Sequence, residues 1–257
     1  MAGEWNLIVN ACRACNEKKA RLEDDISAIT MQPDIAGRHA IDNPHLRDEA
    51  ARKGKGAISR STKRPVRESV ENLKFSTQLM PGVTIDFDMY AAPQLDHDRG
   101  FELAMYQIRA FFYMITYDEV TQRGRYWQGI FAPAIFAPKL DWGNVVLVGF
   151  QRLISSWDCR VIAIGASEFF KVLIRRSPDS RPVWAWAVQW NCNHRLVGFF
   201  GDETAVNDLF KQLPRLRVSR IDTGPNSYID TRLDVPLAPA DDVLFIEPQP
   251  HGPADSD

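Results

Sequence analysis

The sequence VIAIGASEFFKVLIRRSPDSRPVWAWAVQWNCNHRLVGFF spans residues 161–200. It contains four apolar runs separated by short turn-like pieces at 165–168, 177–180 and 191–193. Because connections this short join neighbouring antiparallel strands, the pattern predicts a β-meander. Helical periodicity is present on both sides of it, at 101–120 with Asp98 as a suitable cap and at 203–213 with Asp202 as the cap. The pattern therefore predicts the α+β class, with helices covering a sheet face.

Aromatic residues gather in two of these elements. Trp184, Trp186 and Trp190 are two and four positions apart, so they share one face of their strand. That face is either core or an exposed platform for a ligand or nucleic acid, and core is favoured because large aromatics on a sheet usually meet a covering helix. For the aromatics of 101–120, a core-facing stripe is likewise favoured over a base-stacking platform.

Local structure is also predictable elsewhere. The alternation over 83–91, after the turn at Pro81-Gly82, is typical of a half-buried strand. Residues 126–140 predict a packed loop with a short strand, and residues 142–157 fit either a strand or a helix. A short helix is expected from about His45. The tail from Gly224 is expected to be extended and partly disordered, with one possible strand at 243–246.

The chain has 257 residues, of which 45% are hydrophobic and 25% are charged, and its formal net charge is −2. This length suffices for one large domain or two small ones. No apolar run approaches the length of a membrane-spanning helix, and the N-terminus lacks the pattern of a signal peptide. Four cysteines do not make a secreted disulfide scaffold. We therefore expect a cytoplasmic protein.

Residues 6–25, NLIVNACRACNEKKARLEDD, combine a short apolar run with a Cys-x-x-Cys pair. The run predicts the end of a strand, and Asn10 is a suitable N-cap for the following helix. At a helix start Cys12 and Cys15 lie on one face, and two thiolates at this spacing form half of a tetrahedral zinc site. The alternatives are two small buried hydrophobes or a redox pair, although a thioredoxin-like motif needs a preceding βαβ unit.

This stretch resembles the C-terminal half of the ββα-metal unit of HNH (His-Asn-His) endonucleases. The resemblance covers less than a tenth of the chain. The matching residues are Asn6, Leu7, Ile8, Cys12, Cys15, Asn16 and Lys19. The resemblance implies a metal-dependent DNA endonuclease that hydrolyses phosphodiester bonds. It implies that Asn6 orients the catalytic His and that Asn16 helps to hold a catalytic divalent ion such as Mg²⁺. Cys12 and Cys15 would belong to a structural Zn²⁺ site completed by a second Cys-x-x-Cys.

In that family the Asp-His pair and the second Cys-x-x-Cys lie upstream of this motif, where this sequence has only residues 1–5. No His precedes Asn6, and His39 and His45 come after the helix, where surface positions are favoured over metal ligation. We therefore expect either a truncated nuclease or an inactive homologue. The alternative is a non-catalytic nucleic-acid-binding or regulatory protein in which the cysteine pair only stabilises the fold.

Basic residues gather between Arg47 and Arg67, where eight stand against two acidic residues for a local net charge of +6. The Gly, Ser and Thr among them predict a loop-like strip that binds DNA phosphates without sequence preference. A solvated surface loop is the simpler interpretation, but the nearby HNH-like helix favours DNA contact. The residues expected to hold DNA are Lys19, Arg52, Lys53, Lys55, Arg60, Lys63, Arg64 and Arg67.

These patterns divide the chain into a partial HNH-like ββα-metal unit at 1–35, a basic linker and DNA-contact segment at 36–78, an α+β domain at 79–222 and a tail at 223–257. The α+β domain contains no Ser-His-Asp order, no Gly-rich phosphate loop and no metal cluster, since Cys192 and His194 alone do not make a site. We expect it to select the target or a partner, through a partner protein or a homo-oligomer. An enzyme of another kind is the third interpretation.

Overall fold

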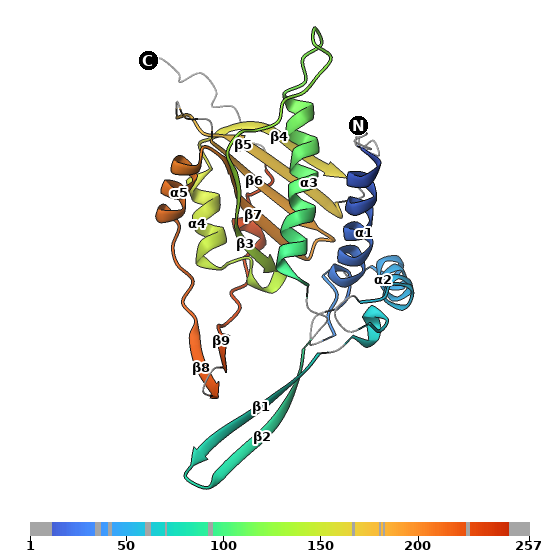
Figure 1. Ribbon diagram of the computed structural model, residues 1–257, viewed down its shortest axis with the longest axis vertical. Helices are drawn as coiled ribbons and strands as arrows, with labels where there is room; N and C mark the ends of the chain where they lie inside the picture. Colours follow the sequence, from blue (N-terminus) through green and yellow to red (C-terminus); the bar gives the residue numbers. More distant parts are fainter. Residues whose placement is uncertain are drawn as a thin grey trace.

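A computed structural model describes residues 12–33, 37–40, 43–59, 63–69, 71–91, 95–165, 168–179, 181, 183–224 and 227–246. At its centre is a five-stranded antiparallel sheet with the order β3-β7-β6-β5-β4 (Figure 1). The strands are β3 (Ile130–Pro138), β4 (Asp158–Gly165), β5 (Phe170–Arg176), β6 (Val183–Trp190) and β7 (His194–Gly201). The predicted meander and the α+β class are confirmed. The short strand expected within 126–140 is the nine-residue β3, which pairs with β7 at the sheet edge.

One face of the sheet is covered by α1 (Arg13–Thr30) and α3 (His97–Ile115). Figure 1 shows α3 lying across the strands with α1 beside it. The three tryptophans of β6 pack on this face, which confirms the core interpretation. Two ion pairs, Lys18–Glu102 and Asp25–Arg99, join the two helices. The buried residues of this layer are Leu22, Ile26, Leu103, Ala104, Ile108, Phe111, Phe112, Phe136, Val172, Ile174, Trp186, Val188, Trp190, Leu196 and Phe200.

The opposite face is covered by α4 (Val145–Leu153) and α5 (Glu203–Gln212). Since successive strand residues point to opposite faces, Leu173 and Phe199 lie here while their neighbours Val172 and Phe200 lie under α1 and α3. Leu244, from the C-terminal segment, is also buried in this core. The sheet therefore sits between two helical layers.

The helix starts differ from prediction in two places. Cys12, not Asn10, is the N-cap of α1, and its Sγ accepts a hydrogen bond from the backbone N–H of Cys15 at 3.3 Å. Asp96, not Asp98, caps α3, because its carboxylate accepts from the backbone N–H groups of residues 98 and 99. Asp202 caps α5 as predicted. Of the two structures considered for 142–157, the helix is correct, as α4.

The basic segment is more ordered than a loop-like strip. Helix α2 (Pro44–Gly56) takes up its first half, capped by Asn43 and with proline in the first turn, so the short helix expected near His45 is confirmed. A bridge between Ile58 and Pro65 and the short helix η1 (Val66–Glu68) follow. The helix rather than a loop therefore carries half of the basic charge.

Two hairpins extend from the sheet in the same direction (Figure 1). One consists of β1 (Glu71–Met80) and β2 (Val83–Ala91), and the other of β8 (Ser219–Gly224) and β9 (Ser227–Thr231). The strand predicted at 83–91 is confirmed, but Val83 and Ile85 are exposed, so its start is not half-buried. The domain boundaries expected after 78 and 222 fall inside β1 and β8. The tail prediction is wrong in part, since β9 is regular structure and residues 243–246 form a turn after η3 (Pro239–Asp241) instead of a strand.

The short helix η2 (Lys139–Asp141) leads from β3 into α4. None of the helices in the described ranges is both long and apolar enough to cross a membrane.

Candidate functional site

The first turn of α1 exposes a pair of thiols. Cys12 and Cys15 are both free and solvent-exposed. The hydrogen bond from the Cys15 side chain lowers the pKa of Cys12, and the same contact raises the pKa of Cys15. The helix N-terminus adds a partial positive charge that favours a thiolate here. The pair therefore offers two sulfur atoms with unequal pKa values on one exposed turn.

The residues of the resemblance are only partly described. Asn16 is exposed in the same turn, and its backbone N–H donates to the carbonyl of Cys12 at 3.0 Å. Lys19, one turn further along, pairs with Glu23 at 2.6 Å. Asn6 and Arg60 lie outside the described residues. The structure thus places Cys12, Cys15 and Asn16 together on one exposed turn.

The side chains of this turn fit the implied zinc ion better than the implied magnesium ion. Two thiols at the start of a helix suit half of a structural zinc site. Within the described ranges, no cluster of three His, Cys, Asp or Glu side chains completes it. Asn16 supplies one neutral oxygen, and its neighbour Glu17 is paired with Arg13 at 2.7 Å. By itself this set does not make a Mg²⁺ site, because such a site uses carboxylates.

The basic residues of α2 are fixed to different degrees. The Lys53 ammonium donates to the Ser27 hydroxyl at 2.8 Å, which ties α2 to α1. Arg52 forms a two-point ion pair with Glu49 at 2.9 and 2.6 Å, and this hydrogen bonding lowers the pKa of Glu49. Exposed cations that the structure assigns to the same segment are Lys55, Lys63, Arg64 and Arg67. Together they form a basic surface on α2 and the turn after it.

A cavity of about 380 Å³ lies beside this surface, between α1, α2, α3 and the ends of β5 and β6. Ile26 and Leu103 make it apolar, while Phe170 and Trp190 supply aromatic rings. Polar side chains of all three helices and of the β6–β7 turn also line it. Apart from Lys53, which was expected to hold DNA, none of the lining residues was predicted as a site residue, because the cavity combines segments far apart in the sequence.

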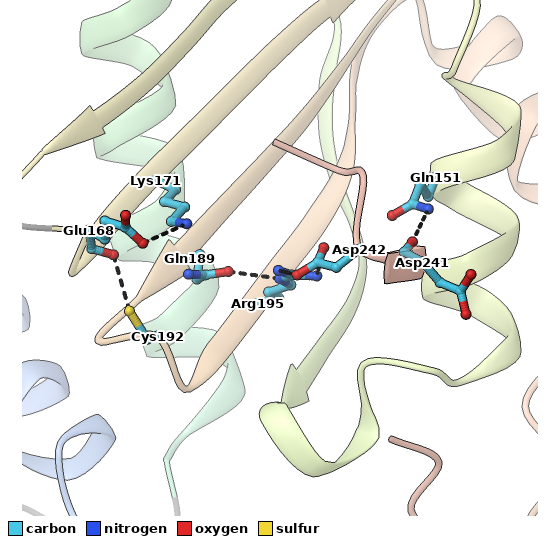
Figure 2. Close-up of polar contacts among 8 residues, drawn as sticks. All are labelled: Gln151, Glu168, Lys171, Gln189, Cys192, Arg195, Asp241 and Asp242. Atoms are coloured by element: carbon cyan, nitrogen blue, oxygen red, sulfur yellow. Dashed lines mark hydrogen bonds and ion pairs between the residues drawn. The ribbon is translucent and has the colours of Figure 1, made fainter. Parts of the chain in front are cut away.

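A second polar group lies on the face of the sheet that α4 and α5 cover (Figure 2). Lys171, Gln189 and Arg195 are paired positions on β5, β6 and β7. The buried Arg195 donates to Gln189 at 2.9 Å and to both carboxylate oxygens of Asp242 at 2.8 and 2.6 Å. Its guanidinium also lies 3.5 Å from the ring centroid of Trp142. Each nitrogen of the guanidinium thus donates a hydrogen bond, and the cluster fastens the C-terminal segment to the sheet.

The turn after β6 does not form a metal site. The Cys192 thiol donates to the Glu168 carbonyl at 3.2 Å (Figure 2), and burial raises its pKa. His194 packs against Phe136, and its Nδ1 has no hydrogen-bond partner among the described residues. Burial, and to a lesser extent the charge of His97, lowers the pKa of His194 to about 4. The imidazole is therefore neutral at physiological pH.

Comparisons with protein-family models, with curated proteins and with solved structures found no match.

Proposed function

We propose that this chain is part of an HNH-type DNA endonuclease, which hydrolyses phosphodiester bonds with the help of metal ions. The observation that carries the proposal is the exposed turn formed by Cys12, Cys15 and Asn16, the three best-described residues of the resemblance. Its thiols are free of disulfides and open to solvent, so a second cysteine pair can approach them. When bound there, zinc would fasten this turn to the segment that supplies the remaining ligands.

The basic surface supports DNA as the substrate. It lies on α2, which is joined to the cysteine-bearing α1 through Lys53 and Ser27. Each cation that neutralises a phosphate releases a counterion, so binding here would be sensitive to salt and blind to sequence. Lys55, Lys63 and Arg67 are suited to this role because their side chains are exposed on α2, on the turn after it and on η1.

A non-catalytic nucleic-acid-binding or regulatory protein is the second candidate. The observation in its favour is that the described parts of α2, η1 and the turn between them already expose several cations. Phosphate binding needs only these cations, whereas hydrolysis also needs a general base. The two candidates share the DNA contact and differ in cleavage.

Plasmid cleavage with Mg²⁺ or Mn²⁺ separates them, on this chain and on a form extended upstream to the next in-frame start. The nuclease proposal expects cutting by the extended form, lost on Asn16→Ala with the DNA affinity unchanged. Cutting by neither form, with salt-sensitive DNA binding retained, would favour the binding protein. Absence of both cutting and binding would refute both candidates.

Two binding measurements accompany that assay. For DNA, the triple variant Lys55→Ala, Lys63→Ala, Arg67→Ala should reduce the slope of log affinity against log salt by up to about 2.7, at about 0.9 per phosphate contact. The matched control neutralises the exposed Arg152, Arg160 and Lys211 elsewhere. For zinc, the extended form should bind one ion, and Cys12→Ser with Cys15→Ser should abolish it. Equal loss of DNA affinity in both triple variants would contradict the assignment of the basic surface.

A further inference from the structure

The cavity between α1, α2, α3 and the sheet has the size of a small-molecule site. Its volume of about 380 Å³ falls within the range of about 300–1,000 Å³ that is usual for such pockets. It is partly open to solvent, and Leu46 and Lys53 of α2 belong to its lining. Nothing in the proposed nuclease chemistry uses it.

Two amide groups lining the cavity have unused hydrogen-bonding capacity. The Gln107 carbonyl oxygen accepts from the Trp190 indole N–H at 2.9 Å, which leaves the two amide hydrogens of Gln107 free. The Asn191 amide nitrogen donates to the Thr30 hydroxyl at 2.6 Å, which leaves the Asn191 carbonyl oxygen free. Neither remaining atom has a partner among the described residues. The cavity therefore offers one fixed donor and one fixed acceptor.

The aromatic wall of the cavity is rigid. Trp190 is 5% exposed and is held by its hydrogen bond to Gln107. Phe170 stacks on Phe111 of α3, with ring centroids 6.0 Å apart and planes 23° apart. Because Trp190 is almost fully buried, the partly exposed ring of Phe170 is the surface that can bind a flat ring by stacking, without losing side-chain entropy. A ligand that uses both the wall and the amides is planar, aromatic and edged with one acceptor and one donor.

Charge excludes a phosphate group as the part held inside. Glu23 and Glu49 line the same cavity, and its ammonium group, Lys53, already donates to Ser27. An extended acyl chain would leave the two amides unpaired, at a cost of about 1–3 kcal/mol for each buried group. A nucleobase meets each requirement, because it stacks by its faces and hydrogen-bonds through its edge.

We propose that this cavity binds a single nucleobase, stacked on the partly exposed ring of Phe170 and hydrogen-bonded to Gln107 and Asn191. The base comes either from a free nucleoside or from an unstacked nucleotide of a single-stranded nucleic acid. The second source rests on the proposed function, because the basic surface of α2 at the cavity mouth would then hold the flanking phosphates. The first source is independent of it.

The test measures the anisotropy of 2-aminopurine fluorescence on the full chain. One arm uses 2-aminopurine riboside, and the other a single-stranded oligonucleotide with one internal 2-aminopurine. Gln107→Leu should weaken base binding about tenfold, as expected for the loss of one hydrogen bond to the base. Leu46→Trp, which fills the cavity from α2, should abolish it. The matched control is Gln128→Leu, an exposed glutamine outside the cavity, and thermal unfolding verifies that each variant folds.

Each possible outcome either supports or overturns the inference. Anisotropy that rises with either probe and is lost in Leu46→Trp supports the cavity, and the arm that responds identifies the source of the base. A response from the riboside without binding of the oligonucleotide supports the cavity while contradicting the proposed DNA contact. Oligonucleotide binding without a 2-aminopurine response, or a response unchanged in Leu46→Trp and Gln107→Leu, overturns the inference and leaves the proposed function standing. No response from the riboside together with no binding of the oligonucleotide overturns the inference and contradicts the proposed DNA contact.

Discussion

The two faces of the five-stranded sheet are covered by helices from different parts of the chain. On one face, α4 and α5 lie next to the strands in sequence, and the C-terminal segment adds Leu244 and the Arg195–Asp242 pair. On the other face, α1 and α3 come from the N-terminal half and leave a cavity between themselves, α2 and the sheet. The first face is closed and the second is open at one end.

This difference separates stability from binding. On the closed face the polar side chains hydrogen-bond to one another, so few of their donors and acceptors remain for a ligand (Figure 2). The open face carries the features of both proposals, which are the exposed thiols, the basic surface and the cavity. If the helices of the open face are nevertheless integral to the fold, both cores should unfold as one unit.

Substitution of two adjacent phenylalanines of β7 tests whether the two cores unfold together, and it should give the largest losses of stability. Phe199 packs against Phe150 and Phe210 on the closed face, and Phe200 against Phe112 and Trp127 on the open face. Both are fully buried, so Phe199→Ala and Phe200→Ala should each lower the free energy of unfolding by about 3–5 kcal/mol. Urea unfolding followed by tryptophan fluorescence and by circular dichroism measures both. Coincident transitions support one unit, whereas a separate early transition in Phe200→Ala would show an independent open-face layer.

The next largest effect concerns the buried ion pair of the closed face. Asp242→Ala removes the partner of Arg195, whose side chain is 4% exposed, and should cost roughly 3 kcal/mol because an unpaired buried charge remains. The double variant Arg195→Met, Asp242→Leu removes both charges and should recover most of that loss. Thermal unfolding at neutral pH compares them. A double variant less stable than Asp242→Ala alone would mean that stacking on Trp142, and not charge pairing, dominates at this site.

The sequence predicts the strands of the meander well. Prediction of local structure fails where tertiary contacts override the local preference of the chain. β3 contains Pro133 and Pro138, which argue against a strand, yet an edge position with a bulge after Pro133 accommodates them. The run VVLVGF favours a strand, but Asn144 accepts hydrogen bonds from the N–H groups of Val146 and Leu147 and starts helix α4. In both cases a few specific contacts outweigh a weak local propensity.

The candidate sites differ in predictability for the same reason. The exposed cysteine turn is local, so its spacing alone places two sulfurs on one helix start. The cavity depends on Gln107 of α3 and Asn191 of the β6–β7 turn, which only the packing of the helices on the sheet brings together. A sequence pattern shows no sign of such a pair, since each residue is unremarkable by itself.

A smaller effect should appear as a pH dependence of the free energy of unfolding, caused by His194 on the open face. The folded-state pKa of His194 is about 4, below the ordinary value of 6.5, so the unfolded chain binds more protons between these values. Stability is therefore fully present above about pH 6.5 and falls as the pH is lowered, by about 2 kcal/mol at pH 5 from this group. Urea unfolding at pH 8 and pH 5 measures the difference. His194→Phe should remove about 2 kcal/mol of it, and His45→Phe, at an exposed position, should not.

The smallest effect concerns the first turn of α1. Cys12 contributes only a helix cap and lies in solvent, so with reductant and chelator present Cys12→Ser should keep the wild-type stability and Cys12→Ala should lose about 0.5 kcal/mol. Asp202→Ala at the cap of α5 is the matched change on the closed face and should cost about 1 kcal/mol, since its carboxylate is charged. Chemical denaturation resolves these values. A loss above about 2 kcal/mol in Cys12→Ser would mean that the thiol is packed in the metal-free protein, and an exposed turn poised for zinc would then be the wrong description of this end of the helix.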